Sequence, residues 1–139
     1  MKLSNKKGFT IVELLVSLAI IAMLFSITFT LLSGIRQKSR DARRMSDVRE
    51  IKKALSLYAN QNNKFPTSAT ETIITGNDII SVELEDDGVI SETPTDPMHP
   101  TYSYAYQTDA LGNTYIISFC LETNDIPNYS EGCANEITP

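Results

Sequence analysis

Residues 6–13 read Lys6-Lys7-Gly8-Phe9-Thr10-Ile11-Val12-Glu13, and an apolar run continues behind them to Leu32. At about 1.5 Å per helical residue, the stretch from Phe9 to Leu32 is long enough to cross a hydrocarbon layer of roughly 30 Å. It contains no Pro and no Gly, so no residue interrupts a helix. Its one charged residue is Glu13, which should be neutral or paired in apolar surroundings.

An ordinary secretory signal differs from this stretch in the position of its small residue. Such a signal has an apolar segment of about 7–15 residues, followed by small residues at the cleavage site. Here Gly8 precedes the run, so cleavage between Gly8 and Phe9 would remove only the basic leader. The apolar helix would stay on the mature chain, with Glu13 one helical turn after the new amino terminus. The alternative is an uncleaved signal anchor that carries a chance Glu.

The charge of the 139-residue chain is unevenly distributed around a net value of −5. Residues 1–53 carry eleven basic and four acidic side chains, a net +7. Residues 54–139 carry one basic and thirteen acidic side chains, a net −12. An acidic distal part argues against nucleic-acid binding through it. The length predicts one folded domain in addition to an anchor.

Residues 35–62 keep a helical period, so the chain is expected to open with one continuous helix from Phe9 to about Asn62. Gly34 weakens this helix without ending it, and Pro66 stops it. One face is predicted to be apolar and to receive a small domain, and its members are Ala42, Met45, Val48, Ile51, Leu55, Tyr58 and Asn62. The opposite face is predicted to be charged, and its members are Arg43, Arg44, Asp47, Arg49, Glu50, Lys52 and Lys53.

The rest of the chain is rich in loops and predicts a small sheet. Residues 67–75 are a polar connector, and residues 80–85 alternate as in a strand, although a short helix fits nearly as well. Residues 102–106 and 115–121 alternate clearly and flank a turn with Gly112-Asn113, which predicts an antiparallel hairpin packed on the helix. The tail, residues 124–139, is expected to be irregular.

Cys120 and Cys133 predict one disulfide, because two cysteines in an exported domain usually pair. The closed loop would stabilise the fold by roughly 3 kcal/mol on the chain-entropy estimate. A metal site would need further ligands, and the one histidine, His99, is distant in sequence. No phosphate-binding loop, metal motif or catalytic constellation is recognisable. We therefore expect no catalytic residue, no metal, no cofactor and no enzymatic activity.

The amino-terminal pattern resembles the class III leader of type IV pilins and of the pseudopilins of type II secretion. Gly8, Phe9, Thr10 and Glu13 match that motif position for position. Features after the apolar run are similar to the major pseudopilin, and they are Asp47, Ile51, Ala54, Leu55, Tyr58, Phe65-Pro66 and Asp96-Pro97. The resemblance implies a pilin-like α+β fold: a long N-terminal helix with a transmembrane first half, packed on a small antiparallel sheet with a C-terminal disulfide loop.

The resemblance also implies a function as a structural subunit of a type IV pilus or a type II secretion-like filament. Residues 1–8 would be a leader that prepilin peptidase cleaves after Gly8, and Phe9 would then be N-methylated. Residues 9–34 would span the membrane and polymerise, residues 35–64 would be the amphipathic half of the helix, and residues 65–139 would form the head. Glu13 would pair with the Phe9 nitrogen of a neighbouring copy and set the register of assembly.

The implied partners are the peptidase and methyltransferase, other copies in a helical filament, and an inner-membrane assembly platform. The chain would cross the cytoplasmic membrane once with its C-terminal domain outside, and would then enter a periplasmic or cell-surface filament. Folded domains translocate largely regardless of flanking charge, so the basic segment Arg36–Lys53 does not oppose this placement. That segment is either a solvated face or a partner for the acidic residues Glu83–Asp87 of neighbouring heads.

The chain departs from the family pattern in two respects, and two alternative functions remain open. Many type IV pilins have a Pro in the membrane helix, and this chain has none between Phe9 and Phe65. The pseudopilin calcium loop is not recognisable, because Asp96 and Asp109 do not form a ligand-dense spacing. The alternatives are a membrane-anchored binding module that never polymerises and a DNA-uptake pilin. Glu13 discriminates against the first, because a mere anchor has no use for it.

Overall fold

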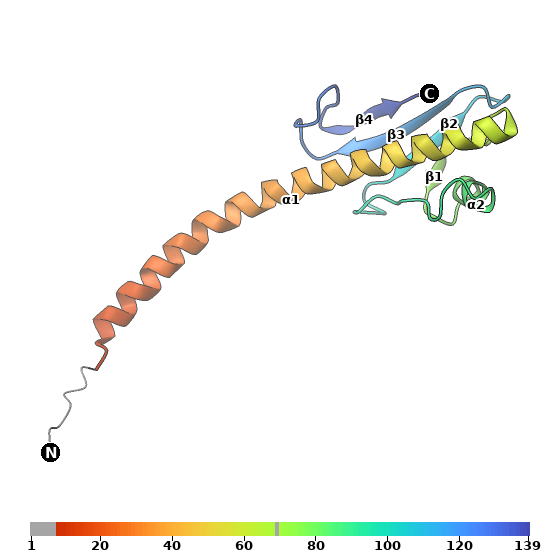
Figure 1. The fold of residues 1–139 in the computed structure, drawn as a ribbon. Coiled ribbons are helices and arrows are strands. Elements are labelled where there is room, and N and C mark those ends of the chain that lie inside the picture. The colour runs from red at the N-terminus through yellow and green to blue at the C-terminus, as the bar shows by residue number, and fades with distance from the viewer. Residues whose placement is uncertain (1–7, 69) are drawn as a thin grey trace, which may run out of the picture. The chain divides into compact units, whose positions relative to one another are not determined.

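The computed structural model describes residues 8–68 and 70–139, without the side chains of residues 27–31. The described chain divides into two compact units, Met1–Arg36 and Gln37–Pro139. Its elements are labelled in Figure 1, and in chain order they are α1 (Ile11–Asn62), β1 (Thr72–Ile74), α2 (Ile79–Asp86), β2 (Tyr104–Thr108), β3 (Tyr115–Leu121) and β4 (Gly132–Ile137).

Helix α1 confirms the prediction of one continuous helix. It runs through Gly34 without a break, because a single Gly costs a helix only about 1 kcal/mol. It ends at Asn62, and the next residue, Asn63, has a positive φ of 57°. A left-handed residue directly after the last helical position is a common helix terminator, and Asn tolerates that conformation better than most residues. The helix has therefore already ended before the chain reaches Pro66.

The second unit is a four-stranded antiparallel sheet with α1 on one face. The strand order is β1-β2-β3-β4, and every neighbouring pair is antiparallel. The predicted hairpin is confirmed as β2 and β3, whose register pairs Ala105 with Ser118 and Thr108 with Tyr115. The predicted packing of the hairpin on α1 is also confirmed, since one buried cluster joins Met45, Val48, Ile51, Ala54, Leu55 and Tyr58 of α1 to Tyr104, Tyr106, Tyr115, Ile117, Phe119 and Leu121 of the strands.

Residues 79–86 form a helix, so the strand-like interpretation of residues 80–85 is wrong and the helical alternative is correct. Asp78 caps α2, because its carboxylate accepts from the N–H groups of Ile80 and Ser81 at 3.1 and 3.0 Å. The residues that α2 buries are Ile80, Ser81 and Leu84, which follow a helical period. Alternation in a segment this short does not decide between the two structures, whereas the capping Asp does.

Strands β1 and β4 were not predicted, and the expectation of an irregular tail is wrong for Gly132–Ile137. β4 pairs with β3, with Ser118 opposite Glu136, although its own residues are mostly exposed and do not alternate between apolar and polar. The disulfide between Cys120 and Cys133 is confirmed, with an S–S distance of 2.03 Å, and it links these two strands. An edge strand held by a crosslink and by backbone hydrogen bonds needs no apolar alternation, so the pattern gives no signal.

The charged face of α1 was predicted wrongly at two positions. Arg44 and Asp47, assigned to that face, are buried. The apolar face was also predicted wrongly at two positions, because Ala42 and Asn62 are exposed. The Asp47 carboxylate accepts a hydrogen bond from the Tyr104 hydroxyl at 2.9 Å. A face assigned from residue type counts every Arg as exposed, but a charged side chain can be buried when its partners are buried with it.

The β2–β3 turn contacts the chain that follows α1 at Gly112. The Phe65 N–H donates to the Gly112 carbonyl at 2.8 Å, and Gly112 has a φ of +72°. A Cβ at this position would lie 2.8 Å from the Phe65 carbonyl oxygen, which is too close for a real contact. Only glycine satisfies both the backbone conformation and the close approach.

We predict that Gly112→Ala destabilises the protein more than Gly88→Ala. Both glycines have a positive φ, but a Cβ at Gly88 meets nothing within 4 Å. Gly88→Ala should therefore lower the free energy of unfolding by about 1–2 kcal/mol, the cost of a positive φ at a residue with a side chain. Gly112→Ala should cost about 1–3 kcal/mol more, because the backbone at Phe65 must move. Urea unfolding measures both losses, and equal losses would contradict the proposed contact.

Candidate functional site

The start of α1 is closed by reciprocal hydrogen bonds between Thr10 and Glu13. The N–H and the hydroxyl of Thr10 both donate to Glu13 Oε2, at 3.1 and 2.9 Å. In return, the Glu13 N–H donates to Thr10 Oγ1 at 3.2 Å. This arrangement is a capping box, in which a Thr and the Glu three residues later satisfy each other's backbone donors.

The capping box corrects one step of the sequence analysis. Glu13 was expected to have no use in a chain that is merely anchored, but it has a local use as a helix cap. The first N–H groups of a helix have no partner within it, so a carboxylate at this position is stabilising in any chain. The spacing Thr10-x-x-Glu13 is the signal that could have revealed this role. Glu13 alone therefore does not discriminate assembly from anchoring.

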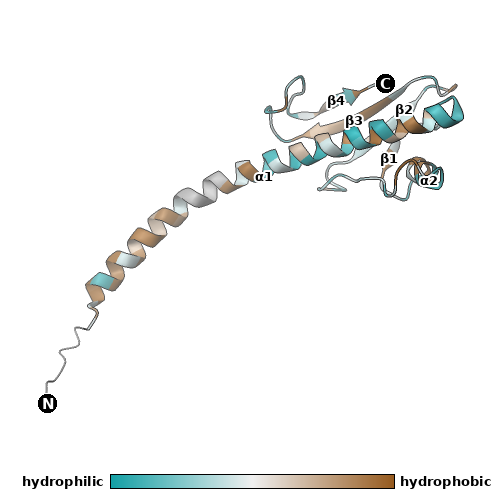
Figure 2. Ribbon diagram, in the orientation of Figure 1, coloured by the Kyte–Doolittle hydropathy of each residue, from teal (hydrophilic) through white to brown (hydrophobic). Residues whose placement is uncertain are grey.

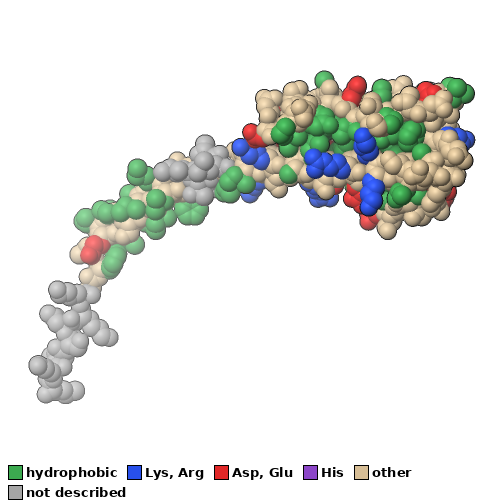
Figure 3. Space-filling model, turned by 45° about the horizontal axis from the view of Figure 1, so that its top comes forward, with side chains coloured by type: hydrophobic (Ala, Val, Ile, Leu, Met, Phe, Trp, Pro, Cys, Tyr) green, Lys and Arg blue, Asp and Glu red, His purple; other side chains and the backbone are tan. Residues whose placement is uncertain are grey.

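The first unit exposes large apolar side chains along α1, which Figure 2 shows as a run of hydrophobic residues. Between residues 9 and 25 their exposed fractions run from 51% at Ile21 to 79% at Ile11. On the face in view, Figure 3 shows the same side chains gathered in the described part of this unit. They are Phe9, Ile11, Val12, Leu14, Leu15, Val16, Leu18, Ile20, Ile21, Met23, Leu24 and Phe25. An apolar surface of this extent marks a contact with lipid or protein.

In the part of the chain that the structure describes, no helix combines the length and the mean hydropathy that crossing a membrane requires.

The predicted processing site lies at the edge of the described residues. Gly8 and Phe9 are both exposed, and a Cβ added at Gly8 would meet nothing within 4 Å. Packing within the described chain therefore does not require a glycine here. The basic leader residues Lys2, Lys6 and Lys7 lie outside the described residues.

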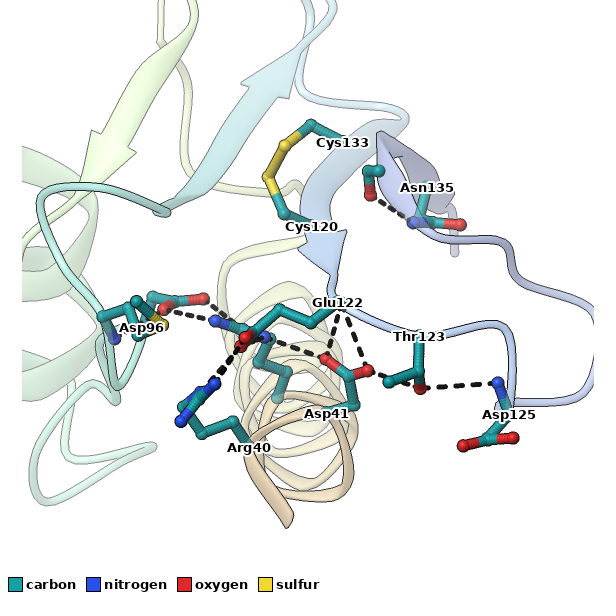
Figure 4. A network of polar contacts seen from close by, with 12 residues as sticks. Arg40, Asp41, Asp96, Cys120, Glu122, Thr123, Asp125, Cys133 and Asn135 are labelled. Carbon is teal, nitrogen blue, oxygen red and sulfur yellow. Dashed lines mark hydrogen bonds and ion pairs between the residues drawn. A yellow bond between two sulfur atoms is a disulfide. The ribbon is translucent and has the colours of Figure 1, made fainter. Parts of the chain in front are cut away.

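The second unit contains a buried arginine, Arg44, that connects three segments of the chain. Figure 4 labels its carboxylate partners Asp41, Asp96 and Glu122 within the network of polar contacts. Arg44 Nε donates to Asp96 Oδ2 at 2.8 Å, in the loop before β2. Arg44 Nη1 donates to Asp41 Oδ1 at 2.8 Å and to Glu122 Oε1 at 2.7 Å. The Tyr102 ring lies 5.0 Å from the guanidinium carbon, within cation–π distance. The Arg44 side chain is completely buried.

The acidic partners of Arg44 are themselves held by further bonds. Arg40 Nε donates to Glu122 Oε1 at 2.7 Å, and the Asp41 carboxylate accepts from the N–H of Glu122 at 2.9 Å. Thr123 Oγ1 also donates to Asp41, at 2.8 Å. Two cations thus meet three carboxylates, and most of their donors and acceptors are satisfied. This matters because a buried ion pair is favourable only when its remaining groups are also hydrogen-bonded.

The pKa values of Arg44 and Glu122 favour the charged forms of these two side chains. Burial of Arg44 alone would favour the neutral form, but its bonds to the three carboxylates outweigh that effect and raise the pKa of Arg44. The hydrogen bond from Arg40, assisted by Arg44, lowers the pKa of Glu122 to about 2 against the opposing effect of burial. The bonds of Arg44 make the cluster a structural clamp between α1, the loop before β2 and the end of β3.

Asp96 and Asp109, the acids nearest the hairpin, use their carboxylates for contacts within the chain. Asp96 uses its carboxylate for Arg44 and for the Met98 N–H, at 2.7 Å. Asp109 accepts from the N–H groups of Asn113 and Thr114, at 2.7 and 2.9 Å. Within residues 8–68 and 70–139, no three His, Cys, Asp or Glu side chains are grouped as a metal site requires. His99 is exposed and contacts Ser103.

We predict that Arg44→Met destabilises the protein far more than Arg43→Met. Removing the buried guanidinium leaves three carboxylates without their shared partner, and breaking a buried ion pair costs about 3–5 kcal/mol. Arg43 is the matched control, because its side chain is 65% exposed and its nearest carboxylate oxygen, on Asp47, is 3.8 Å away. The free energy of unfolding from guanidinium or thermal denaturation measures the difference. Losses within about 0.5 kcal/mol of each other would show that the cluster is not the clamp described here.

Comparison with known proteins supplies the family. Residues 3–32 match the prokaryotic N-terminal methylation motif, and residues 32–134 match type II secretion system (T2SS), protein G. The chain is 27% identical over 102 residues to type II secretion system core protein G of Escherichia coli strain K12, with 70% of each chain covered. It is 27% identical over 106 residues to the core protein G of Aeromonas hydrophila, covering 73% of this chain and 74% of that protein. No solved structure matches the chain significantly. Because the protein G match spans most of the described head and the helix beneath it, the chain belongs to the type II secretion system protein G family of pseudopilins.

Proposed function

We propose that this protein is a pseudopilin subunit that polymerises through the apolar part of α1 after cleavage at Gly8. The observation that carries this proposal is the uncovered apolar surface of residues 9–25, with Glu13 as its one carboxylate. Such a surface costs free energy in water, at roughly 25 cal/mol for each Å² of apolar area, until lipid or other copies cover it. The match to the N-terminal methylation motif and to protein G supports the same function.

Processing is proposed to occur between Gly8 and Phe9. The exposure of both residues leaves the bond open to a membrane peptidase, and the absence of a side chain at Gly8 lets the backbone enter a narrow active site. Cleavage would expose the Phe9 amine, and a methyltransferase would then modify it. The leader lysines would hold the junction at the cytoplasmic surface, with residues 9–34 in the membrane and the head outside.

The disulfide and the acidic head support an extracytoplasmic position for residues 65–139. Disulfides persist in oxidising compartments, and the bond between Cys120 and Cys133 crosslinks the edge of the sheet. In this proposal the inner-membrane assembly platform takes up the membrane-inserted subunit and adds it to the filament. Nucleic acid is not a proposed partner, because the second unit uses Arg40 and Arg44 internally and is otherwise mainly acidic.

We predict that the mature chain begins at Phe9 and is heavier by one methyl group than the unmodified peptide. Mass spectrometry of the amino-terminal peptide from the native host measures both properties. The control is the variant Gly8→Val. Its valine side chain should block cleavage, so the chain should keep the whole leader, residues 1–8. A wild-type protein that retains its leader would overturn the proposed processing.

We predict that Glu13→Gln impairs filament formation as severely as Glu13→Ala. Gln keeps the oxygen acceptor of the capping box but has no charge, so it separates the two roles of Glu13. If Glu13 neutralises the Phe9 amine of a neighbouring copy, both variants should insert and be processed but lose about tenfold or more in filament yield, because an unpaired charge in apolar surroundings is costly.

The yield of sheared or purified filaments, normalised to the processed subunit in the membrane, is the measurement. A Glu13→Gln variant that assembles as well as the wild type would show that Glu13 acts only as a helix cap. If wild-type subunits are processed but never associate, the chain is an anchored module instead.

A further inference from the structure

The outer face of α2 combines exposed apolar and acidic side chains. Ile79 is 67% exposed and Val82 is 44% exposed, although the opposite side of this short helix is buried in the core. The acidic residues Asp86 and Asp87 at its end are also exposed. These side chains line a shallow hollow at the surface of the second unit. We call Ile79, Val82, Asp86 and Asp87 the α2 patch.

An exposed row on α1 in the same unit has the complementary composition, and two of its residues, Lys53 and Leu57, line a hollow beside Val89 and Ile90. Arg49, Lys53 and Leu57 are spaced four residues apart, so they lie in one row along the helix. All three are exposed, Leu57 by 41%. Among the described residues, neither Arg49 nor Lys53 has an ion-pair partner within 4 Å, whereas Lys38, Arg40 and Arg44 do. Figure 3 shows basic side chains along α1 on the face in view. We call this row the α1 stripe.

The two surfaces are complementary in charge, and Arg49 also matches the acids in spacing. On α1, Arg49 precedes Leu57 by eight positions, about 12 Å at 1.5 Å per residue. On α2 the acids follow Ile79 by seven and eight positions, about 10–12 Å by the same rise. An antiparallel placement with Leu57 on Ile79 would therefore bring Arg49 to Asp86 and Asp87. Lys53 would lie about 5 Å short of these acids, a distance that its long side chain can span.

The contact cannot form within one copy. Helix α2 is held beside the C-terminal end of α1, because Glu83 accepts from the Tyr58 hydroxyl and Asp87 Oδ2 accepts from Asn62 Nδ2 at 2.6 Å. Tyr58 belongs to the buried face of α1, whereas the α1 stripe lies on the exposed side of the same helix. The α2 patch of one copy is therefore available only to the α1 stripe of another.

We propose that the α1 stripe of one copy docks on the α2 patch of a second copy of this chain. The two surfaces differ, so the contact is head-to-tail and repeats in one direction, as a helical filament requires. Each patch is too small to bind alone, since stable interfaces bury about 1,200–2,000 Å². The contact therefore orients heads that the apolar helix has already brought together. This inference rests on the proposed polymerisation and adds the surface through which the heads meet.

Charge reversal in the full-length protein tests the proposal. Arg49→Glu and Asp86→Lys should each lower filament yield roughly tenfold, because each places like charges together. The double variant, which restores an opposite-charge pair, should recover most of the wild-type yield, as expected for a direct coupling. Lys64→Glu and Glu71→Lys are matched controls, since both side chains are exposed, lie outside the two surfaces and make the same changes in net charge.

A zero-length carbodiimide crosslink gives a second readout that does not depend on filament yield. Membrane-extracted chains, half of them isotopically labelled, should give a mixed-isotope crosslink between Lys53 and Asp86 or Asp87. Normal assembly of both single variants, or failure of the double variant to recover, would overturn the proposed pairing. Crosslinks from Lys53 only to other acids would also overturn it. A crosslink without any filament would support the contact and overturn the proposed polymerisation, so the two failures are distinguishable.

Discussion

A single buried cation sets how the segments of the second unit meet. Arg44 has no exposed side-chain surface, and its partners come from α1, from the loop before β2 and from the end of β3. Apolar packing brings the sheet onto the helix, but it is not directional and allows a range of positions along the helix. A guanidinium has fixed donor directions, and a misplaced carboxylate would leave it with an uncompensated buried charge. The ion cluster therefore selects one register from those that the core allows.

The sequence predicts those parts of this fold that repeat a pattern over several turns or several strand residues. The long helix, the hairpin of β2 and β3 and the disulfide were all predictable, because each depends on local periodicity or on residue count. Strand β1 has only three residues, and β4 does not alternate between apolar and polar residues, so both depend on the backbone partners that β2 and β3 offer them. A strand that depends on its neighbour need not show an alternating pattern in its own residues. The helical structure of residues 79–86 was readable from the capping residue Asp78, which carries more information than alternation over six residues.

The sequence predicts some of the residues of the candidate site and not others. The motif around Gly8 and Phe9 is recognisable from the sequence, because all of its residues are sequence neighbours. Arg44 was assigned to the wrong face of α1, because its partners Asp96 and Glu122 lie 52 and 78 residues away in the chain. No local pattern shows that one arginine of the pair Arg43-Arg44 is buried and the other exposed. The capping role of Glu13 was readable from its neighbour Thr10, and it stands beside the assembly role that we propose.

The basic residues of α1 divide into two groups, and this division constrains assembly. Arg40 and Arg44 neutralise carboxylates within their own chain, so they are not available to other copies. Arg49 and Lys53, further along the same helix, lie on the side away from the sheet. In the proposed filament, the apolar surface of the first unit can hold copies together but cannot fix how each copy is rotated about its helix axis. Apolar contact is not directional, and for the same reason the core alone does not fix the register of the sheet on α1. Inside the head the direction comes from Arg44, and between heads we propose that it comes from Arg49 and Lys53.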